Sequence, residues 1–147
     1  MKQSSWMTAG VLGAALLALL GYSVWHNTDL GSGPIAKCEQ DSGKCEKNLG
    51  AILNFSEPIV VNKALMLTLT LPESMAQGDF WQGRLEGRDM YMGITPVTLK
   101  AADRSNQYQG QLRIPICTTE QMAWRLILES SDGSKSILMY EFMMSQP

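Results

Sequence analysis

Four sulfur-bearing residues in the second half of the chain are the side chains best suited to metal chemistry. Met90 and Met92 flank a tyrosine in the stretch DMYMG, Cys117 ends the stretch IPIC, and Met122 follows shortly after. Thioether and thiolate sulfurs are soft ligands that suit Cu(I) and are poor ligands for calcium or magnesium. If the segments that carry these residues meet, the sequence predicts a Cu(I) site, with Met122 as a candidate fourth ligand.

The same residues are open to two other interpretations. On a strand, residues two apart share a face, so Met90 and Met92 are expected to project together. Methionine also fills gaps in hydrophobic cores, and free cysteine is among the most buried residue types. Ordinary packing and a partner-binding surface therefore remain alternatives to metal binding. Met75 is a further candidate ligand.

The chain is poor in groups for catalysis. The only histidine, His26, precedes the expected domain, so no Ser/His/Asp or Cys/His pair can be assembled within it. There is no C-x-x-C motif and no glycine-rich phosphate loop. With 12 Lys and Arg against 14 Asp and Glu, and no basic block, nucleic acid is not an expected partner. We predict a protein that is not an enzyme.

Two of the three cysteines are close in sequence. Cys38 and Cys45 enclose the polar, turn-like segment EQDSGK. A disulfide between them closes a short loop and contributes about 2–3 kcal/mol, whereas the alternative is two free thiols in a flexible leader. The C-x6-C spacing does not match a zinc site. A disulfide implies an oxidising compartment, which in a bacterium is the periplasm, and it leaves Cys117 unpaired.

An uncharged apolar segment, 8–25, precedes the rest of the chain. As a helix it would be about 27 Å long, close to the thickness of a bilayer's hydrocarbon core. Trp6, Tyr22 and Trp25 lie near its ends, where the membrane interface favours aromatic rings. A cleaved signal peptide is the alternative, but 21–23 is a poor cleavage site. We expect a cytoplasmic N-terminus at 1–7, an inner-membrane anchor at 8–25, a linker with the disulfide loop at 26–47 and a periplasmic domain at 48–147.

The expected domain consists of short alternating apolar runs separated by turn signals. The clearest run, ALMLTLTL at 64–71, places its leucines on one face, and no later segment shows a sustained helical period. The pattern predicts an all-β domain, an immunoglobulin-like antiparallel β-sandwich of about seven strands. Leu49 and Ile116 are expected to face the core, and Pro115 indicates an edge or bulge. The expected strands are 49–55, 64–71, 79–87, 95–101, 108–116, 122–130 and 136–144.

This order of features resembles the FixH/YtkA-like group of membrane-anchored proteins with immunoglobulin-like domains. The similarity covers roughly residues 60–130 and includes LEGRDMYMGITPVTL and YQGQLRIPICTTEQMAWRLIL. The chain is still more similar to bacterial single-pass membrane proteins with C-x6-C, M-x-M-G and P-x-C motifs. The resemblance implies copper handling and assembly of a copper-containing respiratory oxidase, and it picks out Met90, Met92 and Cys117. Because the domain lacks histidine, Cu(I) rather than Cu(II) is the expected state.

Two functions from different classes are therefore expected. In the first, the domain holds Cu(I) at a shallow sulfur site and passes it to a docked acceptor by ligand exchange, while 8–25 binds the lipid bilayer. In the second, the chain is a structural accessory subunit of a membrane protein complex. Convergent, partly exposed sulfurs favour the first function. Sulfurs in separate core regions, with Cys117 enclosed behind Trp124, favour the second.

Overall fold

The computed structural model describes residues 34–132 and 136–145. They belong to a compact unit that spans Gly33–Pro147. The described residues form strands and no helix, so the prediction of an all-β domain is confirmed for this part of the chain. The strands are β1 (Ile35–Lys37), β2 (Ile52–Phe55), β3 (Ala64–Thr70), β4 (Phe80–Gly87), β5 (Ile94–Ala101), β6 (Gln107–Arg113), β7 (Gln121–Ser130) and β8 (Ile137–Ser145).

The predicted N-terminal segments 1–7 and 8–25 lie outside the described residues. In the part that is described, no helix is long and apolar enough to span a membrane. Of the expected linker, 26–47, the structure describes residues 34–47. There β1 pairs with β8, so this stretch is part of the sheet.

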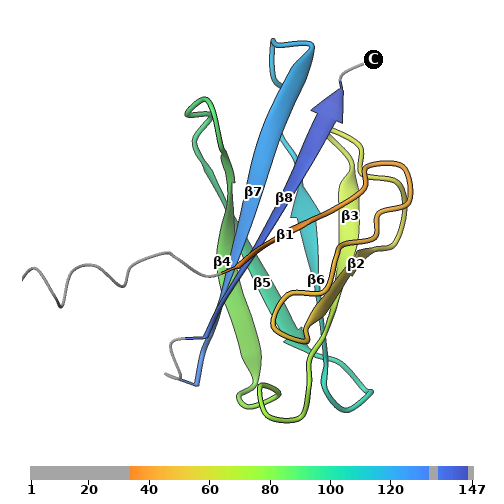
Figure 1. The fold of residues 1–147 in the computed structure, drawn as a ribbon, viewed down its shortest axis with the longest axis vertical. Coiled ribbons are helices and arrows are strands. Elements are labelled where there is room, and N and C mark those ends of the chain that lie inside the picture. Colours follow the sequence, from red (N-terminus) through yellow and green to blue (C-terminus); the bar gives the residue numbers. More distant parts are fainter. Residues whose placement is uncertain (1–33, 133–135, 146–147) are drawn as a thin grey trace, which may run out of the picture. The chain divides into compact units, whose positions relative to one another are not determined.

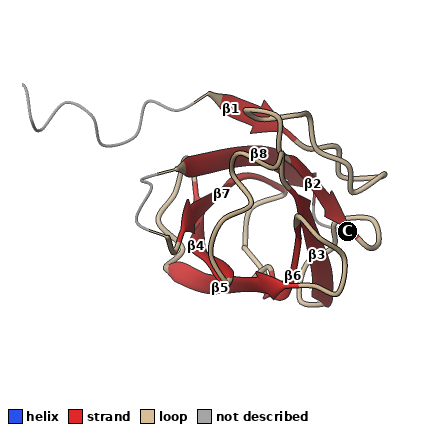
Figure 2. Ribbon diagram, turned by 90° about the horizontal axis from the view of Figure 1, so that it is seen from below, coloured by secondary structure: helices blue, strands red, loops and turns tan. Residues whose placement is uncertain are grey.

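All eight strands belong to one hydrogen-bonded sheet, in the order β1-β8-β7-β4-β5-β6-β3-β2. β1 runs parallel to β8, and the other neighbouring pairs are antiparallel. The sheet curls around its core, which brings β8 toward β2 (Figures 1 and 2). The segment 38–51 bridges these ends: Cys38 N donates to Glu141 O (2.8 Å), and Phe55 N donates to Gly43 O (2.8 Å).

The core follows from the alternation seen in the sequence. Leu65, Leu67 and Leu69 of β3 are fully buried, as are the indoles of Trp81 and Trp124. Each buried leucine contributes about 1.5–3 kcal/mol relative to an exposed one. Where the curl closes, the rings of Phe55 and Phe142 meet edge to face at 5.8 Å. The predicted inward faces of the central strands are therefore confirmed.

Two expected core residues are exposed instead. Leu49 (56% exposed) and Gly50 form the tight turn between the bridge partners Asn48 and Ala51, and both have positive φ, 50° and 89°. Two consecutive positive φ values are typical of the primed types of hairpin turn. Ile116 (59% exposed) lies beyond the end of β6, so strand alternation no longer sets its direction. The prediction that these two residues face the core is wrong.

β5 and β6 form the shortest antiparallel ladder in the sheet. Only two residue pairs connect them, Lys100↔Gln109 and Ala101↔Tyr108. Both strands continue past this ladder toward the opposite end of the sheet. The loop 88–93 precedes β5 there, and the segment 114–120 follows β6. These two connections carry Met90, Met92 and Cys117, whereas Met122 lies on β7.

Candidate metal centre

Met90 and Met92 lie on a loop. β4 ends at Gly87 and β5 begins at Ile94, so both methionines occupy the loop 88–93. The predicted strands 79–87 and 95–101 likewise leave these residues between strands, so the period-two alternation that would project both side chains together does not apply to them. Met90 is 48% exposed, whereas Met92 is half-buried and packs against the core.

Local interactions hold this loop in place. Arg88 N donates to Ala123 O of β7 (2.9 Å). The Arg88 guanidinium forms a bidentate ion pair with Asp89 (2.8 and 2.9 Å). Gly87 allows a close approach, because a Cβ there would overlap the Met90 carbonyl oxygen and the Met122 methyl group. The base of the loop is therefore anchored, while Met90 projects into solvent.

The loop brings one methionine to the free cysteine. The Sγ of Cys117 lies 3.8 Å from the Sδ of Met92, a distance at which the thiol can donate a hydrogen bond to the thioether. Cys117 is 2% exposed. With metal–sulfur bonds of roughly 2.3 Å, as in zinc thiolates, a tetrahedral angle places two ligand sulfurs about 3.8 Å apart. The pair therefore has the spacing of a two-sulfur chelate.

The other candidate sulfurs are placed differently. Met122 is buried and its methyl group lies beneath the loop next to Gly87. Within the described residues, no hydrogen bond joins Met122 to the Cys117 thiol. Met75 belongs to the turn after β3, where its N donates to Pro72 O (2.9 Å), at the other end of the sheet. Of the predicted ligands, the structure brings together Met92 and Cys117, with Met90 on the same loop.

The two connections that carry this pair also contain two carboxylates, Asp89 and Glu120. In the part of the chain that the structure describes, no three His, Cys, Asp or Glu side chains are grouped for metal binding. The donors that the structure brings together here are the Cys117 thiol and the Met92 thioether. That donor set matches soft, monovalent copper and not an oxygen-seeking cation.

Thr119 is a functional candidate that the sequence reasoning missed. Its Oγ1 lies 3.3 Å from Cys117 Sγ. The hydrogen bond from its side chain, followed by that from its backbone amide, lowers the pKa of the Cys117 thiol from the usual value. The sequence carries no signal for this contact, because the local hydrogen bonds typical of threonine are made to backbone groups and not to a side chain two residues away. Thr119 thus favours the thiolate, which is the form that binds metal.

Replacing Thr119 with valine is expected to raise the pKa of Cys117. Hydrogen bonds to a thiolate favour its charged form, so removing one favours the thiol. The thiolate's ultraviolet absorbance, followed against pH, reports this directly, since Cys117 is the free cysteine of the domain. The pKa of the Cys117 thiol is lower in the folded protein than in the unfolded chain. The stability that the thiolate confers is therefore fully present above the pKa of the unfolded thiol. That stability is lost as the pH falls through the folded value.

Two variants serve as controls for this titration. Cys117→Ser should show no thiolate transition at all. Thr118→Val removes the neighbouring hydroxyl but keeps the backbone amide of Thr118, a minor contributor to the lowered pKa, and should leave the titration nearly unchanged. A Thr119→Val protein that titrates at or below the wild-type pKa would contradict the role assigned to Thr119.

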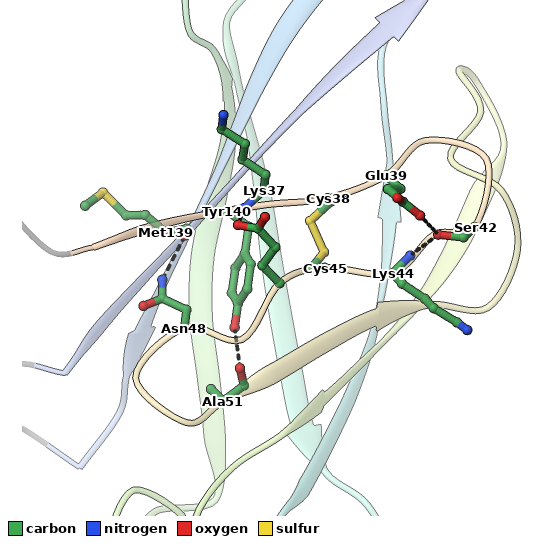
Figure 3. Close-up of a disulfide and its surroundings, with 11 residues drawn as sticks. Lys37, Cys38, Glu39, Ser42, Lys44, Cys45, Asn48, Ala51, Met139 and Tyr140 are labelled. Atoms are coloured by element: carbon green, nitrogen blue, oxygen red, sulfur yellow. Dashed lines mark hydrogen bonds between the residues drawn. A yellow bond between two sulfur atoms is a disulfide. The ribbon is translucent and has the colours of Figure 1, made fainter.

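Cys38 and Cys45 form the predicted disulfide (Figure 3). They face each other as antiparallel bridge partners at the base of the hairpin that follows β1. Nearby, the buried Asn48 side chain donates to Met139 O (2.9 Å) and to Pro34 O (2.8 Å). The disulfide and these hydrogen bonds hold β1 at the edge of the sheet. They lie on elements other than the loops that carry Met92 and Cys117.

Comparisons with known proteins return no relative. No protein-family model, no curated protein and no solved structure matches the chain.

Proposed function

We propose that this chain is a membrane-anchored periplasmic protein that binds Cu(I) through Met92 and Cys117. Through that site it transfers copper or assists assembly of a copper-containing respiratory complex. The observation that carries the proposal is the 3.8 Å separation of the two sulfurs, which come from loops 25 residues apart in sequence. The finer architecture proposed for the domain is an immunoglobulin-like β-sandwich, consistent with its antiparallel pairing and buried inner faces.

The exposures of the sulfurs suggest how copper would move. Met90 is half exposed, Met92 is half-buried and Cys117 is buried, so the sulfurs form a gradient from solvent to core. An incoming Cu(I) would first meet Met90 and then exchange onto the inner pair. Binding displaces the proton of the Cys117 thiol, and the lowered pKa of that thiol reduces the cost of its loss. Release to an acceptor follows the same exchange in reverse.

A Cu(I) titration of the fragment 33–147 against a competing colorimetric chelator tests this function. We expect one Cu(I) per chain. Cys117→Ser and Met92→Leu should each weaken binding by more than the roughly 10- to 100-fold cost of losing a group that only orients a ligand. Met90→Leu should slow transfer to the chelator more than it lowers affinity.

Met66→Leu is the matched control. Met66 is a partly exposed methionine on β3, so its loss tests whether any surface thioether contributes. Met66→Leu should bind Cu(I) like the wild type. If the folded wild-type fragment fails to compete even with a weak chelator, copper binding is excluded, and Met92 and Cys117 are packing atoms.

A second function is favoured by the apolar side chains around the same loops. Tyr91 is 83% exposed, and Ile94 and Ile116 are also exposed. Clustered exposed apolar residues are typical of surfaces that bind another protein. We therefore keep as the alternative a structural accessory subunit of a membrane protein complex. It predicts that Tyr91→Ser and Ile116→Ser disrupt complex formation in cells, whereas Cys117→Ser does not.

A further inference from the structure

A groove lies on the outer face of the sheet, and neither Met92 nor Cys117 lines it. It has a volume of about 430 Å³, within the range of pockets that hold small ligands. Its floor is formed at β7 and β8, and its walls come from β1, the disulfide hairpin and the start of the loop 88–93. No part of the copper proposal uses this surface.

Strand register explains why the surface is hollow there. Ala123 of β7 pairs with Met143 of β8, and Arg88 N bonds to Ala123 O on the other side. Ala123 therefore sits between two long side chains, Arg88 and Met143, and its own side chain is a single methyl group. The half-exposed Met143 and the disulfide at Cys38 are further apolar groups in the walls of the groove. The result is an apolar floor with long side chains at its margins.

Charge is distributed unevenly around this hollow. Lys37, Glu141 and Arg125 occupy one cross-strand row, by their pairing in the ladders. Arg125 donates to Glu141 (2.7 and 2.9 Å), and Arg88 lies 3.5 Å from the same carboxylate. Arg88 is itself paired with Asp89. Within the described ranges, no carboxylate lies in ion-pair distance of the Lys37 ammonium.

The lining of the groove thus has an excess of positive charge. Lys37 and Arg88 line it against one acid, Glu141, which Arg125 already neutralises. Glu46 accepts a bond from the backbone amide of Lys37 (3.2 Å), but it is not part of the lining. In Figure 3 the Lys37 side chain extends away from the disulfide hairpin, in a different direction from Lys44. A ligand in the groove would therefore meet an apolar floor and an unpaired ammonium.

We propose that this groove binds a small amphipathic ligand with one negative charge. Its apolar body would lie on Ala123 and Met143, and its anionic group would bind Lys37. The excess charge disfavours a cationic ligand of the same shape. The site is independent of copper, and its test is made on the metal-free fragment 33–147, the compact unit that holds the whole described core.

The test uses two fluorescent probes with the same ring system. Anilinonaphthalene sulfonate carries one negative charge, and N-phenylnaphthylamine is neutral. We expect saturable binding of one sulfonate probe per chain, weakened about fivefold by Lys37→Gln, the size expected for one partly exposed ion pair. The neutral probe should bind more weakly and should not respond to Lys37→Gln. Ala123→Leu should abolish binding of both probes by filling the floor.

Lys44→Gln is the matched control, because it removes a lysine charge from the hairpin that follows β1, at a position that does not line the groove. It should bind the sulfonate probe like the wild type. The proposal is overturned if Lys44→Gln weakens binding as much as Lys37→Gln, or if the neutral and anionic probes bind equally. Should Ala123→Leu fail to fold, the comparison of the two lysine variants still decides between these outcomes.

Discussion

Replacing Gly83 with alanine is expected to destabilise the fold by about 3 kcal/mol or more. Gly83 lies in the middle of β4, paired with Leu128 of β7 and Val97 of β5. A Cβ at this position would overlap the carbonyl oxygen of Ile127 in the neighbouring strand. The obstacle is backbone, so it cannot rotate away, and β4 and β7 must separate. Urea unfolding of the fragment 33–147, followed by tryptophan fluorescence, measures the loss.

Gly93→Ala separates this steric effect from the loss of a glycine in general. Gly93 has φ +81°, and no atom outside its chain neighbours lies within 4 Å of where its Cβ would be. Only backbone strain opposes that substitution, about 1–2 kcal/mol. Gly83→Ala should therefore be clearly the more damaging of the two. Equal stability of Gly83→Ala and the wild type would mean that β4 and β7 do not approach as closely as described.

The strands that could be predicted from the sequence are those whose pattern reflects one buried face. In ALMLTLTL the alternation of leucine with other residues matches β3, since each leucine faces the core and each intervening residue does not. β1 carries no such pattern. It is three residues long, and its partner, β8, lies about a hundred residues further along the chain. A pairing made by tertiary contact leaves no local periodicity to find.

The errors in the predicted core have local causes. Leu49 precedes Gly50 in a turn that requires two positive φ values, so the apolar run that starts there is not yet a strand. Ile116 follows Pro115, and β6 ends at Arg113. In both places an apolar residue was assigned to a strand that begins later or ends earlier. Turn chemistry outweighs hydrophobicity at such boundaries.

The candidate site was predictable in its residue types but not in its geometry. Soft sulfurs near the ends of strands indicated that Met92 and Cys117 could meet, and their sulfurs lie 3.8 Å apart. Met92 could not be distinguished from Met90 in advance, because loop conformation decides which of the two turns inward. Nor did it identify Thr119 as a partner of the thiol. Loop residues lack the periodicity from which strands can be predicted, so their contacts are known only once the fold is known.

Removal of the disulfide by Cys38→Ala and Cys45→Ala together is expected to cost about 2.5 kcal/mol, from the chain-entropy model for a loop of this length. Cys38 directly follows β1, and Cys45 N donates to Leu53 O of β2 (3.2 Å). The bond therefore connects the two end strands of the curled sheet. Without it, β1 keeps its three-pair ladder with β8 and a few hydrogen bonds to the segment that follows, such as Glu46 N to Lys37 O (2.7 Å).

The loss should be local as well as global. Backbone amides of β1, and those of β8 that face it, should exchange hydrogen faster, while β3 should change little, because its ladder with β6 is seven pairs long.

The wild type in reducing buffer should match the double variant, and the stability of the double variant should not depend on reductant. Cys117→Ala should keep the wild-type sensitivity to reductant. Identical wild-type stability in oxidising and reducing buffer would contradict a stabilising role for this bond. An uncovered β8 edge would also expose unpaired backbone groups, so we expect the double variant to aggregate more readily.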